Sequence, residues 1–157
     1  MADSPDTGPA PTLTLDIGAT PEDVRVALDR TTAALLRCGF APGHCGFTEI
    51  VLAEVLNNVV EHAYRDCPRG RIRIDVRAGP ERVDLVIRDR GARMPGDRLP
   101  VGSPVDVDVP VDDLPEGGFG WFLIRTMADQ LVYRREDGGN RLEIGLSLEN
   151  ADLAGHA

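Results

Sequence analysis

Alternation of hydrophobic and polar side chains predicts five β-strands in this chain. In each of them roughly every second residue is apolar, which is the period of a strand with one buried face. Gly79-Pro80 separates the second strand from the third, and Asp137-Gly-Gly-Asn140 separates the fourth from the fifth, so both pairs are expected to form antiparallel hairpins. The expected strands are residues 12–17, 71–78, 82–88, 130–135 and 141–148.

A longer apolar period, typical of helices, occupies three other stretches. Thr20 is a suitable N-cap and Pro21 suits the first helical position, which predicts a helix from there to about Cys38. A second helix is expected at about 46–65 and a third at 119–128. The apolar residues at helical spacing in the second helix are Val51, Leu52, Val55, Leu56, Val59 and Ala63.

The order of these elements predicts an α+β fold, a two-layer α/β sandwich with helices on one face of a mixed, mostly antiparallel sheet. A chain of 157 residues is most simply one domain, which we place at residues 12–148. Residues 1–11 are expected to be a disordered lead-in, and residues 149–157 a C-terminal tail. Residues 90–117 hold five prolines and predict a long loop, which a compact domain keeps when the loop is functional or disordered.

Composition removes several classes of function. A net charge of −9 disfavours direct binding to nucleic acid or to an anionic membrane, because phosphate groups would repel the chain. We expect no membrane span, since no apolar run approaches ~20 residues, and no secretory signal, since the N-terminus is acidic and rich in proline. The three cysteines lack a C-x-x-C spacing, which favours reduced thiols and a cytoplasmic protein.

All seventeen basic residues are arginine. The absence of lysine excludes a P-loop, a protein kinase of the common eukaryotic type and Schiff-base catalysis, each of which needs a lysine side chain. Any nucleotide must therefore be held by backbone amides, a metal ion and arginine.

Three polar residues interrupt the apolar pattern of the second helix. Glu54, Asn58 and His62 are spaced four apart, so they form one stripe along that helix. Side chains at this spacing lie roughly 5–6 Å apart, which lets a carboxylate and an amide oxygen share a metal ion or a polarised hydroxyl group. A solvated helix face is the alternative interpretation.

Two further motifs flank the long loop. Asp89-Arg-Gly91 places a carboxylate at the end of a strand, beside a glycine that lets a flat ligand approach the backbone; a plain turn is the alternative. Glu116-Gly-Gly-Phe-Gly120 opens the third helix, and the free amides at a helix N-terminus suit a phosphate. A flexible hinge is the alternative for this second motif.

The ordered set of motifs resembles the GHKL ATPase superfamily, with its Bergerat nucleotide-binding fold. The set consists of E-x-x-x-N-x-x-x-H-A-Y at 54–64, D-x-G-x-x-x-P at 89–95 and G-G-F-G at 117–120. With Gly118-Phe-Gly-Trp-Phe-Leu-Ile124, the pattern is most similar to the bacterial anti-sigma-factor serine kinases and switch-protein kinases of the RsbW type. The resemblance spans roughly residues 12–148 and implies ATP and Mg²⁺ as cofactors.

The resemblance also implies a role for each motif residue. Asn58 matches the Mg²⁺ ligand, and Glu54 matches the general base that would polarise a seryl or threonyl hydroxyl. Asp89 matches the carboxylate that accepts a hydrogen bond from the adenine amino group, and Gly91 keeps the backbone close to the ring. The other expected ATP contacts are His62, Met94, Gly117, Gly118, Phe119, Gly120 and Asn140. For His62, a structural role at the helix end is the alternative.

Two departures from the family pattern concern the phosphates. Some relatives carry a basic residue just before the glycine-rich element, whereas residues 99–116 contain no arginine and five acidic residues. Arg93, Arg98 and Arg125 are the candidates to replace it. Asn140 also stands where the family often has a threonine. Both departures bear on phosphate transfer more than on nucleotide binding.

Three functions are compatible with these observations. The first is an ATP-dependent serine/threonine kinase that phosphorylates a STAS-type antagonist and binds a sigma factor, acting as a homodimer. The second is a non-catalytic module in which ATP shapes a partner surface, and the third is a detached catalytic domain of a sensor histidine kinase. Glu54 together with Asn58 favours the first over the second. His44, beside Pro42 in a poor helical context, argues against the third because that function needs a helical acceptor histidine.

The partner surface and the single tryptophan complete these expectations. The acidic loop 104–116 and the arginine-rich residues 65–98 are candidate recognition surfaces, or else solvated faces. Trp121 is expected to pack in the core, with a place beneath the adenine pocket as the alternative.

Overall fold

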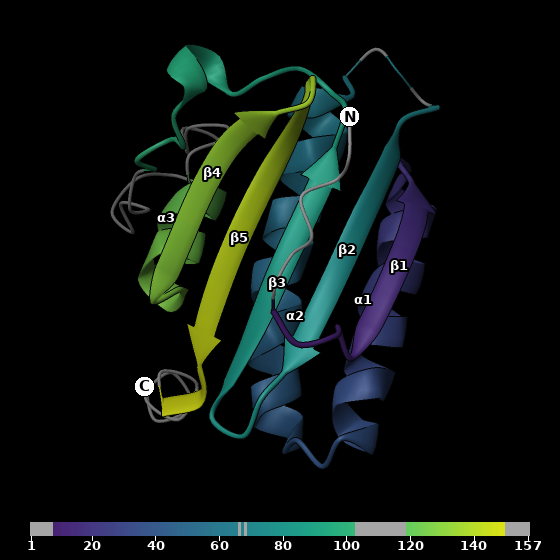
Figure 1. The fold of residues 1–157 in the computed structure, drawn as a ribbon, viewed down its shortest axis with the longest axis vertical. Helices are drawn as coiled ribbons and strands as arrows, with labels where there is room; N and C mark the ends of the chain where they lie inside the picture. The colour runs from purple at the N-terminus through teal and green to yellow at the C-terminus, as the bar shows by residue number, and fades with distance from the viewer. Residues whose placement is uncertain (1–7, 66, 68, 103–118, 150–157) are drawn as a thin grey trace, which may run out of the picture.

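The computed structural model describes residues 8–65, 67, 69–102 and 119–149, which form the expected two-layer α/β sandwich (Figure 1). One five-stranded sheet has the order β1-β2-β3-β5-β4, and all of its pairings are antiparallel, so no parallel pair enters the described sheet. Its strands are β1 (Leu13–Gly18), β2 (Arg71–Ala78), β3 (Arg82–Asp89), β4 (Gln130–Glu136) and β5 (Gly139–Ser147).

The helices lie together on one face of the sheet, as expected (Figure 1). They are α1 (Pro21–Arg37), α2 (Pro42–Asn58) with the π-helical turn η1 (Val59–Ala63) at its end, and α3 (Phe119–Met127). A 3₁₀ turn, η2 (Pro95–Asp97), lies in the loop after β3. Apart from α2, the ends of these elements differ by at most two residues from the expected ones.

The second helix begins earlier than its sequence indicates. It starts at Pro42, whereas the periodicity predicts a start near residue 46. Proline has the φ value that the first turn needs, and burial of Cys45 and Phe47 offsets the low helix propensity of the neighbouring glycines. His44 therefore lies within a helix, and the prediction of a poor helical context was wrong.

A wider turn continues α2 at its C-terminal end, where the sequence predicts an uninterrupted α-helix. The N–H of Tyr64 donates to the carbonyl of Val59 at 3.1 Å, the five-residue spacing of a π-helix. The buried hydroxyl of Tyr64 donates to the Arg71 carbonyl at 2.8 Å and accepts from the Arg90 N–H at 2.7 Å. Tyr64 thus joins the helix end to the start of β2 and to the segment after β3.

The hydrophobic core fills the space between the helices and the sheet. Trp121 belongs to it, with 5% of its surface exposed, so the prediction of core packing is confirmed. The largest side chains buried there include Leu15, Leu35, Leu52, Leu56, Ile72, Ile74, Leu85, Ile87, Ile124, Ile144 and Leu146.

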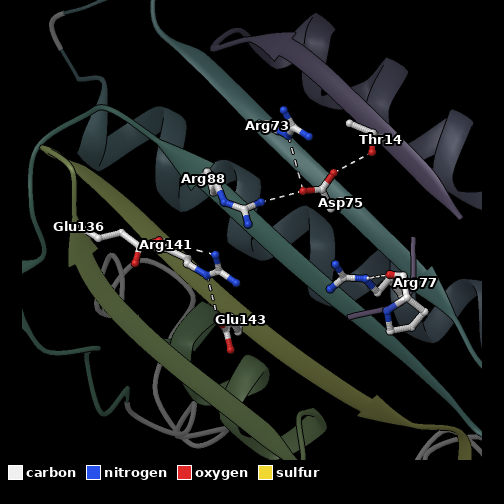
Figure 2. Close-up of polar contacts among 9 residues, drawn as sticks. Thr14, Arg73, Asp75, Arg77, Arg88, Glu136, Arg141 and Glu143 are labelled. Carbon is white, nitrogen blue, oxygen red and sulfur yellow. Dashed lines mark hydrogen bonds and ion pairs between the residues drawn. The ribbon is translucent and has the colours of Figure 1, made fainter. Parts of the chain in front are cut away.

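The opposite face of the sheet carries paired charges (Figure 2). The register sets Arg73, Arg88 and Arg141 directly opposite one another on β2, β3 and β5. Like charges in such positions repel. Asp75, whose side chain is only 7% exposed, pairs with Arg88 at 2.7 Å, and Glu143 accepts from Arg141 at 2.8 Å. Carboxylates on neighbouring positions therefore offset the arginine row.

Both ends of the chain extend beyond the described residues. Within the expected lead-in, the Pro9 carbonyl accepts a hydrogen bond from Arg77 Nε at 2.8 Å, which holds this part of the chain to β2. Residues 1–7 and 150–157 lie outside the described part. No helix of the described chain combines the length and the apolar character needed to cross a membrane.

Replacing Tyr64 with phenylalanine is expected to lower the free energy of unfolding by about 1–3 kcal/mol, because two part-buried hydrogen bonds to the backbone are lost. Urea unfolding followed by circular dichroism measures this change. Thr32→Val is the control, since it removes a hydroxyl that donates to Glu49 at the surface, and should cost below about 0.5 kcal/mol. Equal effects in the two variants would contradict the linking role of Tyr64.

Candidate functional site

The motif residues of β3, β5 and α2 gather at one end of the sandwich. β3 and α2 both run toward this end, and the β4–β5 turn lies there as well (Figure 1). The chain after β3 is fixed to the helix end, since the Ala92 N–H donates to the Ala63 carbonyl at 2.9 Å. The helix stripe and the aspartate motif therefore border one region.

Asp89 is a buried carboxylate in this region, with 7% of its surface exposed. Its Oδ1 accepts hydrogen bonds from the Gly91 N–H and from Asn140 Nδ2, both at 2.8 Å. Within the described residues, Oδ2 accepts none. Burial raises the pKa of Asp89 above its usual range, and the bonds from Asn140 and Gly91 and the charge of Arg135 oppose that rise. The second oxygen is suited to a ligand N–H group.

Gly91 is required by the packing of the protein itself. A Cβ atom at this position would lie 2.5 Å from the Ala63 carbonyl oxygen and 2.7 Å from the Ala63 Cβ. The sequence predicts that this glycine serves the approach of a ligand. The structure adds another reason, which is the close approach of the loop to η1.

Asn140 lies in β5, whereas the sequence places it in the turn. Asp137 and Gly138 have φ values of 52° and 74°, so they form a two-residue hairpin turn and β5 begins at Gly139. In the register between β3 and β5, Asn140 lies directly opposite Asp89. Because its amide also donates to the Ala92 carbonyl at 2.9 Å, Asn140 holds the loop as well as the carboxylate.

Glu54 and Asn58 lie against the start of α3. A Cβ atom added to Gly120 would lie 2.6 Å from Glu54 Oε2 and 3.8 Å from Asn58 Nδ2, so a side chain at this position would displace the Glu54 carboxylate. Asn58 Nδ2 is buried and has no hydrogen-bond partner among the described residues. A buried polar atom without a partner destabilises a fold, and such atoms occur where a ligand supplies the partner.

These side chains fit a magnesium ion that is shared with phosphates. Rotation of the Asn58 amide exchanges Nδ2 for Oδ1, which is an oxygen ligand suited to Mg²⁺, and the Glu54 carboxylate lies close by. In the described part of the chain, no group of three or more histidine, cysteine or acidic side chains could hold a metal ion. Mg²⁺ usually takes one or two protein ligands and completes its shell with water and phosphate oxygens.

His62 lies in η1, whose wider turn changes the angular position of this residue relative to an α-helix. Its side chain is exposed and makes no hydrogen bond to another described residue, which leaves the anchoring alternative without support.

The remaining predicted ATP contacts lie at the two ends of the long loop. Met94 is half-buried after β3 and packs against the core, and Phe119 is exposed at the start of α3, where its ring stacks on Phe122 with centroids 6.4 Å apart. Gly117 and Gly118 lie outside the described residues, as does the acidic stretch 103–116.

Of the arginines considered for the phosphates, Arg125 is engaged by the loop. Its Nε donates to the Pro100 carbonyl at 2.8 Å and its Nη2 to the Leu99 carbonyl at 3.1 Å. Arg93 forms a long, exposed contact of 3.4 Å with Asp97. Arg125 therefore ties α3 to the loop that follows η2.

Tyr133 and Arg135 are not predicted from the sequence, yet both contact the site. Each donates to Asn140 Oδ1, Tyr133 Oη at 2.6 Å and Arg135 Nη1 at 3.0 Å. Alternation along β4 puts the two residues on one face, and the β4–β5 register sets Arg135 opposite Asn140. The two-residue turn fixes that register, so recognising it as Asp137-Gly138 would have revealed both residues.

Known proteins are similar to this chain in sequence. The family model described as Histidine kinase-like ATPase domain matches residues 17–146. The serine-protein kinase RsbW of Oceanobacillus iheyensis is 30% identical over 125 residues, which are 79% of either chain. The serine-protein kinase RsbW of Bacillus cereus strain ATCC 10987 is 33% identical over 117 residues, 72% of either chain.

Solved structures of low sequence identity share the fold. The RsbU and RsbW domains of Rv1364c from Mycobacterium tuberculosis superpose with a TM-score of 0.56 at 15% identity, over 86% of this chain and 31% of that one. The histidine kinase domain of the blue-light activated histidine kinase from Erythrobacter litoralis EL346 gives 0.51 at 18% identity, over 86% and 66%. The chain therefore belongs to the histidine kinase-like ATPase domain family, in its RsbW-type branch.

Proposed function

We propose that this protein is an ATP-dependent serine/threonine kinase that phosphorylates a STAS-type antagonist and binds a sigma factor, as a cytoplasmic homodimer without a direct nucleic-acid or membrane partner. The observation that carries the proposal is the meeting at Gly120 of Glu54 and of Asn58, whose Nδ2 has no hydrogen-bond partner among the described residues. A base and a metal ligand are thereby available at the helix start that follows the glycine-rich motif. The names of the two RsbW relatives support the same activity.

Each residue has a defined task in the proposed reaction. Asp89 Oδ2 accepts a hydrogen bond from the adenine amino group, and the amides at the start of α3 face the phosphates. Asn58 Oδ1 would hold Mg²⁺, which would supply charge neutralisation at the phosphates. Glu54 takes the proton of the attacking seryl or threonyl hydroxyl as the new O–P bond forms, while the bond between the γ-phosphorus and the β,γ-bridging oxygen breaks and ADP leaves.

A second candidate function is ATP-dependent partner binding without phosphate transfer. The contacts of Arg125 favour this function. Its guanidinium group donates hydrogen bonds to the carbonyls of Leu99 and Pro100, and these bonds hold it at the loop and not toward a phosphate. In that case ATP shapes the surface that a partner recognises.

One assay separates the two candidates. The purified protein is incubated with Mg-ATP and each STAS protein of the same genome, and transfer is followed by the mass of the acceptor. Phosphorylation of one acceptor on a serine or threonine supports the kinase. ATP-dependent binding of a partner that stays unmodified supports the second candidate.

Glu54→Gln is expected to lower the rate of transfer by about 10²–10⁴-fold, because the base is lost, while the affinity for ATP stays nearly unchanged. Single-turnover transfer and calorimetric titration measure the two quantities. Glu49→Gln, on the exposed side of the same helix, is the matched control and should transfer at the original rate. If Glu54→Gln transfers phosphate at the rate of the original protein, Glu54 is not the general base.

Asn58→Ala is expected to abolish the gain in ATP affinity that Mg²⁺ provides. The ligand-free variant should be at least as stable as the original protein, since the lost amide atom has no partner. Titrations with and without Mg²⁺, together with thermal unfolding, measure both effects. Asn57→Ala, at the exposed neighbouring position, is the control. An unchanged Mg²⁺ effect in Asn58→Ala contradicts its role as a ligand.

Asp89→Asn is expected to reduce the preference for ATP over GTP by about tenfold or more, because an amide can also donate to the guanine carbonyl. Competition between the two nucleotides for the protein measures the preference. Asp97→Asn, exposed on η2, should leave it unchanged. The same preference in Asp89→Asn and the original protein argues against a contact between Asp89 and the base.

A further inference from the structure

The segment from Asp89 to Met94 is held chiefly by side chains of β4 and β5. Tyr133 Oη accepts from the Met94 N–H at 3.1 Å and donates to Asn140 Oδ1 at 2.6 Å. Arg135 Nη1 donates to the Gly91 carbonyl at 2.9 Å and to Asn140 Oδ1 at 3.0 Å. The two β4 residues therefore contact the segment at Met94 and at Gly91, and both also contact Asn140, which supports the segment.

The amide of Asn140 has no capacity left for a nucleotide. Its Nδ2 donates to Asp89 and to the Ala92 carbonyl, and its Oδ1 accepts from Tyr133 and Arg135. The amide nitrogen faces two acceptors and the amide oxygen faces two donors. This set of partners allows only one orientation of the planar group. That orientation directs an N–H group at Asp89 Oδ1 and leaves Oδ2 for the ligand.

We infer that Tyr133 and Arg135 are positioning residues that fix Asp89 and its loop, through Asn140, and thereby set the preference of the site for adenine over guanine. This inference rests on the proposed ATP-binding function. Neither residue needs to touch the base. Their contribution is the orientation of the carboxylate before the nucleotide arrives, which lowers the entropy lost on binding.

Charge adds to this positioning. An ionised Asp89 accepts a hydrogen bond from the amino group of adenine and repels the carbonyl oxygen that guanine has at the same position. Burial raises the pKa of Asp89, and the charge of Arg135 lowers it. Among the described residues, Tyr64 also interacts with Asp89, and burial raises the pKa of Tyr64. Arg135 therefore helps to keep the carboxylate ionised.

The affinity for ATP is expected to depend on pH. ATP binds the ionised form, so its affinity falls as the pH drops through the pKa of Asp89 in the free protein. Removal of the Arg135 charge raises this pKa further. The fall in affinity then begins at a higher pH, which a purely structural contact would not cause.

The test compares Tyr133→Phe, Arg135→Met and Arg134→Met by calorimetric titration with ATP and with GTP, from neutral to mildly acidic pH. Arg134 is the matched control, because it is exposed on the opposite face of β4 and carries the same charge. We expect Tyr133→Phe and Arg135→Met to bind ATP about threefold to tenfold more weakly, with GTP little changed. Only Arg135→Met should also shift the pH profile upward.

Amide exchange of the nucleotide-free protein gives a second measurement. The Met94 N–H loses its acceptor in Tyr133→Phe and should exchange faster, while Arg134→Met leaves its rate unchanged. If the original protein prefers ATP and the two site variants keep both that preference and the Met94 exchange rate, the inference is overturned and the proposed function stands. If the original protein binds neither nucleotide, the proposed function is overturned together with the inference.

Discussion

The buried hydrogen bond between Asp89 and Asn140 is the contact on which the site depends. It joins the last residue of β3 to the second residue of β5, in the centre of the antiparallel sheet. A slip of one residue between these strands would turn Asn140 to the charged face and leave the carboxylate without its donor. The positive φ values of Asp137 and Gly138 fix the register of β5 against β4, so a hairpin turn outside the site places Arg135 opposite Asn140.

Much of the fold follows from local patterns, and the differences have identifiable causes. Strand alternation and the cap at Thr20 predict the elements, because burial on one face and capping are encoded within short stretches. The early start at Pro42 depends on core packing, which propensity does not contain. The π-turn depends on Tyr64 reaching two distant backbone groups, and no local pattern announces such contacts.

The candidate site also contains residues that can be predicted from the sequence and residues that cannot. Spacing along one helix brings Glu54 and Asn58 together, so that pair can be predicted from the sequence. Their contact with Gly120, and the network of Tyr133 and Arg135, join segments far apart in the chain. A resemblance to a family identifies residues that meet a ligand. It does not identify the residues of this chain that orient them, because those depend on the register found here.

The π-helical turn has a further consequence for the architecture. A turn of this kind amounts to one additional residue inside a regular helix, and each residue of an α-helix advances the chain by about 100°. Deleting that residue would restore a straight helix and swing Tyr64 about a quarter of the way round its axis, away from β2 and Arg90. An irregularity in the backbone is thus what allows a helix of the core to meet the loop beside the carboxylate.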